Sequence, residues 1–403
     1  MASFAHEPGW LQRLAARIGR RRMWWLFCVA WIALIVVGLV NGPRYDYRAY
    51  MKQWARVLAG GNPWLDDPGN VYGVGHQILA VLFLVHPLAP KLLYILSSFG
   101  TFLVMFDAQR RDVAIGLATF ALLFATPFFV ILTPMFGVED TLVTFLTLFA
   151  VDLRIRQART IAPALLLAAA VLTKVYPLAL LPFIATDRGV INFRFVGVFG
   201  AATCLGLLAT VAVWGLPALG IVPFAFVRDG KMLSIFWFLS QSGLSPIAHS
   251  TLARALIVWN SAVVAAVMAS LYALHFFGKM RALPGTVVAM LGLLAFYKVG
   301  NPQYFLCSAS LLIYFLTVDR DRGTLEDRPL LGAAAAYLVV LNLFQIWYQI
   351  SGGSVRYPEV RAFVGLPAFV TGIVLMSRIL SRELRGRTDP GEPIAVIDAR
   401  FGV

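Results

Sequence analysis

Apolar residues form long blocks along almost the whole chain, and short charged or Gly/Pro-containing stretches separate one block from the next. A helix that crosses a bilayer needs about 20 apolar residues. The pattern predicts an all-α polytopic membrane protein in which residues 1–403 form a single integral membrane domain. We expect about twelve spans, at residues 24–41, 91–108, 113–133, 140–154, 160–174, 176–186, 195–214, 252–273, 283–298, 303–318, 329–348 and 360–378.

Two apolar segments do not fit a simple span. Segment 74–90 is bounded by glycine and proline, so we interpret it as an interfacial or re-entrant helix. Segment 176–186 is short and contains two prolines, which predicts a broken hairpin with the preceding helix. If 74–90 crossed the membrane, every downstream loop would change sides.

Composition and charge agree with a membrane protein. Hydrophobic residues make up 60% of the chain and charged residues 13%, whereas soluble proteins have about 45–50% and about 25%. The net charge of +14 comes from basic residues in alternate loops, which the positive-inside rule places in the cytoplasm. This orientation puts a basic N-terminal segment, 1–23, and a C-terminal tail, 379–403, inside. The first apolar run follows five arginines and lacks an A-x-A cleavage site, so we expect a retained helix.

Five ionisable side chains at the ends of apolar segments all emerge on the outer side in this threading: Asp46, Glu139, Asp140, Lys174 and Lys298. Ionisable residues at membrane helix ends are rare and usually functional. Because they come from distant parts of the chain, their shared face indicates a site. Two long outer loops, 42–90 and 215–251, are rich in aromatic residues, glycine and proline, and are expected to contain amphipathic surface helices.

Each acidic candidate has two interpretations. Asp46 could act as a general base on a hydroxyl, or it could be a solvated loop residue paired with Arg44 or Arg48. Glu139 and Asp140 could orient a sugar or an acceptor, or they could favour a helix N-terminus through the helix dipole.

The basic candidates also have alternatives. Lys174 and Lys298 could hold one phosphate as point charges, or they could extend towards water. His76 and His249 have no histidine or acid at metal-binding spacing, so we interpret them as polar contacts. The three cysteines lie within apolar runs and predict neither disulfides nor a metal site.

No nucleotide-binding loop is found in the sequence, so no nucleotide cofactor is expected. A divalent cation is the one cofactor that the sequence leaves open.

Five short motifs resemble, in the same order, those of the GT-C superfamily of polytopic glycosyltransferases, in particular the PIG-M-like and bacterial polyprenol-phosphomannose-dependent mannosyltransferases. They extend over roughly the first three quarters of the chain. The motifs are Asp46-Tyr47 with Gly61-Asn62-Pro63-Trp64 and Tyr72; Gly137-Val138-Glu139-Asp140; Thr173-Lys174-Val175-Tyr176-Pro177; Leu244-Ser245-Pro246; and Lys298-Val299 with Gln303-Tyr304-Phe305. The chain departs from the family pattern at Arg44, Phe136 and Leu172, where the family has Asp, Arg and His.

The resemblance implies inverting transfer of a hexose, in particular mannose, from a polyprenyl-phosphate donor to a lipid or glycan acceptor. Asp46 would be the general base, and Lys174, Lys298 and Arg48 would contact the donor phosphate, where charge grows in the transition state. The site would face the periplasm or exterior of a bacterial inner membrane. Sugar and acceptor contacts would come from Glu139, Asp140, Tyr176, His76, His249, Gln303, Tyr304, Arg228 and Lys231.

Three other functions fit parts of the pattern. One is a transferase of the same superfamily that uses arabinose, glucose or an aminosugar. A lipid-linked glycan flippase or transporter would also bind phosphate, but should have cations in both halves of the membrane. An O-antigen polymerase or ligase typically uses outer-loop arginines rather than a carboxylate after the first helix.

Overall fold

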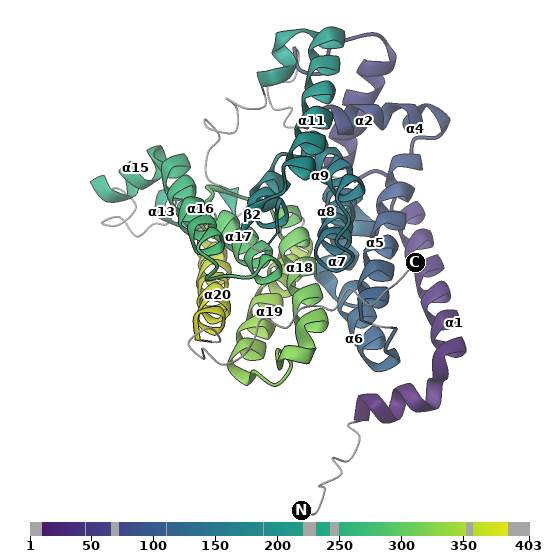
Figure 1. Cartoon of the computed structure of the whole chain (residues 1–403). Coiled ribbons are helices and arrows are strands. Elements are labelled where there is room, and N and C mark those ends of the chain that lie inside the picture. The colour runs from purple at the N-terminus through teal and green to yellow at the C-terminus, as the bar shows by residue number, and fades with distance from the viewer. Residues whose placement is uncertain are drawn as a thin grey trace, which may run out of the picture.

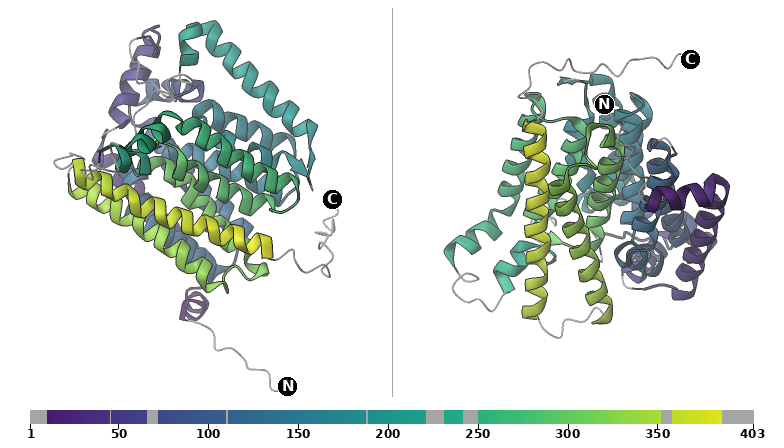
Figure 2. Two further views of the ribbon diagram at one scale, coloured as in Figure 1. Left: turned by 90° about the vertical axis from the view of Figure 1, so that its left-hand side faces the viewer. Right: turned by 90° about the horizontal axis from the view of Figure 1, so that it is seen from below.

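The computed structural model describes residues 10–44, 46–65, 72–109, 111–187, 189–220, 231–241, 250–351 and 358–385. This part of the chain is almost entirely helical and contains two small two-stranded sheets, β1–β2 antiparallel and β3–β4 parallel (Figure 1). The two longest C-terminal helices, α19 (Arg328–Ile350) and α20 (Pro358–Arg385), pack side by side along one flank of the bundle (Figure 2).

The other described elements, in chain order, are α1 (Trp10–Asn41), α2 (Asp46–Leu58), α3 (Val74–Ile78), α4 (Ala80–Val85), α5 (Ala89–Ala108), α6 (Val113–Phe124), α7 (Pro127–Val130), η1 (Ile131–Phe136), α8 (Asp140–Ile155), α9 (Ile161–Thr173), η2 (Tyr176–Leu180), α10 (Leu181–Ile184), β1 (Thr186–Asp187), β2 (Val190–Ile191), α11 (Phe193–Trp214), η3 (Leu216–Gly220), β3 (Lys231–Met232), α13 (Ile235–Gln241), α15 (Thr251–Val258), α16 (Asn260–Phe276), α17 (Ala282–Phe296), β4 (Val299–Gly300), η4 (Pro302–Tyr304), α18 (Phe305–Val318) and η5 (Asp319–Arg322).

Several helices are long and apolar enough to cross a membrane. Within the described residues there are five, Arg21–Asn41, Ala89–Ala108, Phe193–Trp214, Arg328–Ile350 and Gly365–Arg385, and a bent pair over 113–136 makes a sixth if it is one span. The other apolar helices are shorter. The structure therefore supports a helical membrane protein, but it does not confirm twelve full-length spans.

Two predicted spans are interrupted. The span expected at 113–133 bends by 54° between α6 and α7, where Pro127 begins the new helix. Proline lacks a backbone N–H and therefore cannot continue the helical hydrogen-bond ladder. The span expected at 252–273 is divided at Trp259 into α15 and α16, and α15 projects from the bundle (Figure 1). The Asn260 side chain bonds to the Phe296 carbonyl and to the Lys298 N–H, which ties the start of α16 to the end of α17.

Segment 74–90 begins and ends at the same end of the bundle. Near its start, His76 Nδ1 lies 2.8 Å from Glu139 Oε1, at the first residues of α8. Directly after it, Lys91 Nζ donates to the Met135 carbonyl at 3.0 Å, at the end of η1. Because both contacts are made to the same η1–α8 junction, α3 and α4 do not cross the bundle, as the sequence predicts. The segment has an exposed apolar face, consisting of Ile78, Val81, Leu84 and Val85.

The residues on either side of segment 176–186 are bonded to opposite ends of α8. Lys174 pairs with Asp140 in the first turn of α8, and Asp187 pairs with Arg154 in the last turn. A 3₁₀-helix rises about 2.0 Å per residue, compared with about 1.5 Å in an α-helix. Since η2 is a 3₁₀-helix, a short segment can return along α8 and form the second arm of a hairpin with α9.

An ionic network joins the helices at the end of the bundle opposite to the η1–α8 junction. The Arg281 guanidinium donates to Asp319 at 2.7 and 3.0 Å and to Glu383 at 2.9 Å, which connects α17, η5 and α20. Further pairs at this end are Arg156–Asp107, Arg156–Asp152, Arg320–Asp112 and Arg382–Asp327. The basic loops that were expected on the inner side therefore gather at one end.

We expect that Arg281→Met lowers the free energy of unfolding by about 3–5 kcal/mol, because two buried carboxylates would lose their shared counter-charge. The measurement is denaturant unfolding in detergent micelles. Arg328→Met is the matched control, since Arg328 is exposed at the start of α19. Equal effects of the two substitutions would contradict a structural role for the network.

Candidate functional site

Residues from six segments of the chain meet at the η1–α8 end of the bundle. The structure brings eight of the predicted site residues into one connected group, here called the outer cluster: Asp46, His76, Glu139, Asp140, Lys174, Tyr176, Gln303 and Tyr304. They come from α2, α3, the start of α8, the end of α9, η2 and η4. Of the five ionisable residues that were expected on one face, four belong to this cluster, Asp46, Glu139, Asp140 and Lys174, and Lys298 does not.

Asp46 is the half-buried carboxylate of the outer cluster. It begins α2 directly after the turn that follows α1, and Gln303 Nε2 donates to its Oδ2 at 3.0 Å. The two arginines that were considered as its partners bond to backbone carbonyls: Arg44 Nε to Asn41 at 3.3 Å and Arg48 Nε to Pro43 at 3.0 Å. A hydrogen bond from a neutral amide orients the Asp46 carboxylate and leaves its second oxygen available.

Lys174 is a buried cation in a cage of acidic and aromatic groups. Its Nζ lies 2.5 Å from Asp140 Oδ2, and only 4% of Lys174 and none of Asp140 is exposed. The same nitrogen lies 5.0 Å from the centre of the Tyr72 ring and 5.3 Å from that of Tyr304. Aromatic faces attract cations, so the charge of Lys174 is stabilised on several sides. The Tyr176 ring packs 5.7 Å from Tyr304.

His76 and Glu139 form a second buried pair beside the first. Neither residue is exposed, and the His76 ring stacks between Trp54 and Tyr72, with centroid distances of 5.0 and 4.6 Å. Glu139 is the N-cap residue of α8, but its side chain makes no capping hydrogen bond. The two adjacent acids therefore have separate partners.

Two glycines allow α3 to lie directly on the end of α9. A Cβ atom on Gly73 would lie 2.0 Å from the Leu172 carbonyl oxygen, and one on Gly75 would lie 2.2 Å from Thr173 Oγ1. The Gly73 N–H donates to the Thr173 carbonyl at 3.0 Å. This close approach positions the Tyr72 ring beside Lys174 and brings His76 within hydrogen-bonding distance of Glu139. Burial raises the pKa of Tyr72, with the Lys174 charge acting in the opposite direction, so the Tyr72 hydroxyl stays protonated at neutral pH.

Lys91 is a residue of this region that the sequence interpretation missed. It lies in the first turn of α5, is 1% exposed, and its Nζ donates to the carbonyls of Gly42 at 2.7 Å and Met135 at 3.0 Å. It therefore joins the chain just before Asp46 to the chain just before Glu139. A sequence signal existed, because a lysine at an outer helix N-terminus opposes both the helix dipole and the positive-inside rule.

The remaining predicted residues lie elsewhere. Lys298 is buried between α17 and β4, and its N–H donates to Asn260 Oδ1 at 3.0 Å. Lys231 lies in β3, which pairs with β4 in the register Lys231 to Val299. Arg48 is exposed and bonded to Pro43. Arg228 and His249, together with the Leu244-Ser245-Pro246 motif, lie outside the described residues.

Among the described residues, no group of three or more His, Cys, Asp or Glu side chains is arranged to hold a metal ion. The outer cluster consists of one half-buried carboxylate, two fully buried acid–base pairs and several aromatic rings. Such an arrangement can accept a proton at Asp46 and can bind hydroxyl-bearing or anionic groups beside it.

No protein-family model matches the chain, and no curated protein sequence matches it.

We expect that Lys91→Met lowers the free energy of unfolding by about 2–4 kcal/mol, because two buried carbonyls lose their donor. Amide hydrogen exchange should accelerate in residues 42–47 and 135–140, which the lysine joins. Lys52→Met, at an exposed position of α2, is the control. Unchanged exchange in both segments would show that Lys91 does not hold them together.

Proposed function

We propose that the chain is an integral membrane glycosyltransferase with the GT-C architecture. It transfers a hexose, in particular mannose, from a polyprenyl-phosphate donor to a lipid or glycan acceptor, with inversion at the anomeric carbon. The observation that carries the proposal is that Asp46, bonded to Gln303, lies in one cluster with the buried Lys174–Asp140 pair. These residues belong to four separate motifs that resemble the superfamily.

Asp46 is the general base in this proposal. The acceptor hydroxyl attacks the anomeric carbon and forms the new glycosidic bond, while the bond from that carbon to the phosphate oxygen breaks. Asp46 takes the hydroxyl proton, and polyprenyl phosphate leaves with the bonding electrons. A single displacement of this kind inverts the configuration. Gln303 holds one oxygen of Asp46, which orients the other towards the acceptor.

Lys174 provides positive potential for the departing phosphate. An ammonium group has three N–H donors, and the bond to Asp140 uses one of them. Preorganised charge is most effective in a site from which water is excluded, and Lys174 is almost fully buried. Lys298 and Arg48, the other two phosphate contacts expected from the sequence, are not part of the outer cluster, so the proposal depends on Lys174. The rings of Tyr72, Tyr176 and Tyr304 offer surfaces for the sugar.

The charge distribution supports an outward-facing site. The outer cluster lies at one end of the bundle, and the arginine network around Arg281 lies at the other. The positive-inside rule places the arginine network in the cytoplasm. The site then faces the periplasm or exterior of a bacterial inner membrane, where lipid-linked donors without nucleotides are used.

The test is transfer from synthetic polyprenyl-phosphomannose to total lipid and glycan acceptors by purified protein in lipid nanodiscs. Asp46→Asn should reduce turnover by about 10²–10⁴-fold, the usual contribution of a general base, and should retain donor binding. Asp107→Asn, an exposed carboxylate in the inner network, is the control. Equal turnover by Asp46→Asn and the parent protein would refute the assignment, whereas donor binding without transfer by the parent would favour a lipid-linked glycan flippase.

We expect Gln303→Leu to reduce turnover less than Asp46→Asn does, by about fivefold, since one neutral hydrogen bond contributes about 1 kcal/mol. Because Gln303 orients the base, the effect should appear in kcat and leave the KM for the donor unchanged. Steady-state kinetics with the same donor separate these two constants. A rise in KM at constant kcat would instead make Gln303 a substrate-binding residue.

A further inference from the structure

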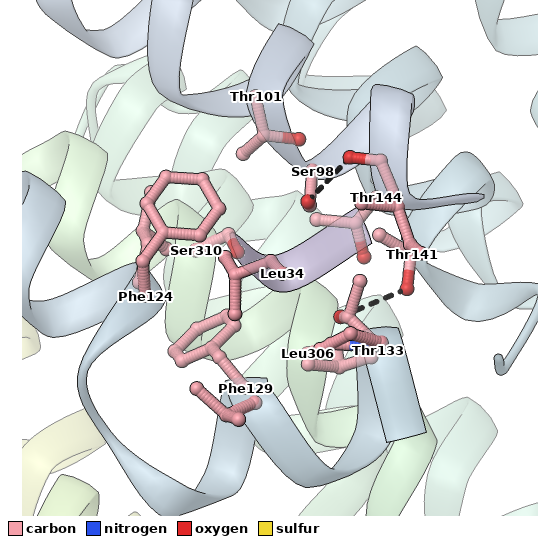
Figure 3. Close-up of a pocket in the computed structure, with 14 residues that line it drawn as sticks. Leu34, Ser98, Thr101, Phe124, Phe129, Thr133, Thr141, Thr144, Leu306 and Ser310 are labelled. Carbon is pink, nitrogen blue, oxygen red and sulfur yellow. Dashed lines mark hydrogen bonds between the residues drawn. The ribbon is translucent and has the colours of Figure 1, made fainter. Parts of the chain in front are cut away.

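A cavity lies inside the bundle next to the first turns of α8. It extends over about 420 Å³ of space between protein atoms, part of which is open to the surroundings of the bundle. Its walls come from α1, α5, α6, the α7–η1 segment, α8 and α18 (Figure 3). One of its lining residues, Thr141, directly follows Asp140, so the cavity lies beside the outer cluster on the membrane-embedded side.

The walls of this cavity are divided between apolar and hydroxyl groups. Phe124, Phe129 and Leu34 are among the apolar residues, and none of the lining residues is charged (Figure 3). The hydroxyl-bearing residues are Ser98, Thr101, Thr133, Thr141, Thr144 and Ser310. An uncharged lining argues against a phosphate or a metal ion, and the hydroxyl groups argue against a purely hydrocarbon occupant.

The hydroxyl groups differ in their hydrogen bonding. Ser98 donates to the Ile95 carbonyl at 2.7 Å, and Thr101 donates to the Ser97 carbonyl at 3.0 Å. Each of these oxygens keeps lone pairs that can accept a hydrogen bond. Thr144 Oγ1 and Ser310 Oγ, in contrast, are buried and have no hydrogen-bond partner. Thr144 is 3% exposed and Ser310 is 1% exposed.

An unpartnered hydroxyl in a membrane bundle is costly, by about 1–3 kcal/mol. Water relieves this cost where a cavity is polar and offers two to four hydrogen-bonding groups, and each molecule occupies about 30 Å³ of liquid volume. This cavity has room for a water molecule and presents donors and acceptors on several walls. An entirely apolar cavity of similar size would stay dry.

We propose that this cavity is a binding site for ordered water, held by Thr144 on α8 and Ser310 on α18. The water hydrogen-bonds to both unpartnered hydroxyls and to the free lone pairs of Ser98 and Thr101. It provides a polar environment one helical turn from Asp140. The site does not depend on the proposed transferase activity.

The test is X-ray radiolytic footprinting of the full chain in lipid nanodiscs, in which bound water is converted to hydroxyl radicals that oxidise adjacent side chains. Leu306 lines the cavity and Leu312 does not, although both are buried in α18. We expect Leu306 to be oxidised several-fold faster than Leu312. The comparison uses the unsubstituted protein, and equal oxidation rates at the two leucines would overturn the proposal.

A double variant, Thr144→Val with Ser310→Ala, tests which groups hold the water. It should reduce oxidation of Leu306 to the rate of Leu312, because Ser98 and Thr101 already donate their hydrogens to helix carbonyls and can only accept a hydrogen bond from the water. Thr286→Val is the control, since Thr286 is buried in α17, outside the cavity, and donates to the Leu283 carbonyl. Fast oxidation of Leu306 in the double variant would show that Thr144 and Ser310 do not hold the water.

Discussion

The pairing of two adjacent buried acids at the start of α8 is the constraint on which the outer end of the bundle depends. Glu139 and Asp140 have no exposed surface, and a charge without a partner in such a place is strongly unfavourable. Glu139 is paired with His76 from α3, and Asp140 with Lys174 at the end of α9. Both pairs can form only if α3, the start of α8 and the end of α9 lie at the same level along the bundle axis. This requirement also places Tyr72 over Lys174.

The same requirement explains the path of the first outer segment. The chain enters it after α1, rests α3 on the end of α9 through two glycines, and returns at Lys91 to the end of η1. Segment 74–90 therefore remains at one end, and the basic residues gather at the other around Arg281. The two ends of the bundle consequently differ in chemistry. Acids and aromatic rings surround one end, whereas arginines bonded to carboxylates connect the helices at the other.

Differences in burial separate the roles of the charged groups at the outer end. The His76–Glu139 and Lys174–Asp140 pairs are buried and hydrogen-bonded, which suits them to hold the geometry of this end of the bundle. Asp46 is half-buried and is bonded to a neutral amide, so it is the carboxylate that remains accessible to a proton donor. The hydroxyl-lined cavity lies beside these pairs, next to the first turns of α8.

The sequence alone determined the class of the protein and the positions of most helix ends, because apolar burial in a bilayer acts along continuous stretches of chain. It also singled out Asp46, Glu139, Asp140 and Lys174, because threading the apolar stretches in order puts all four on the same side. Only the tertiary structure decided which charges pair, since the partners come from segments far apart in sequence. It also showed that the predicted span 252–273 is broken at Trp259, where the next residue, Asn260, bonds to the end of α17. The role of Lys91 likewise depends on two carbonyls that only folding brings together.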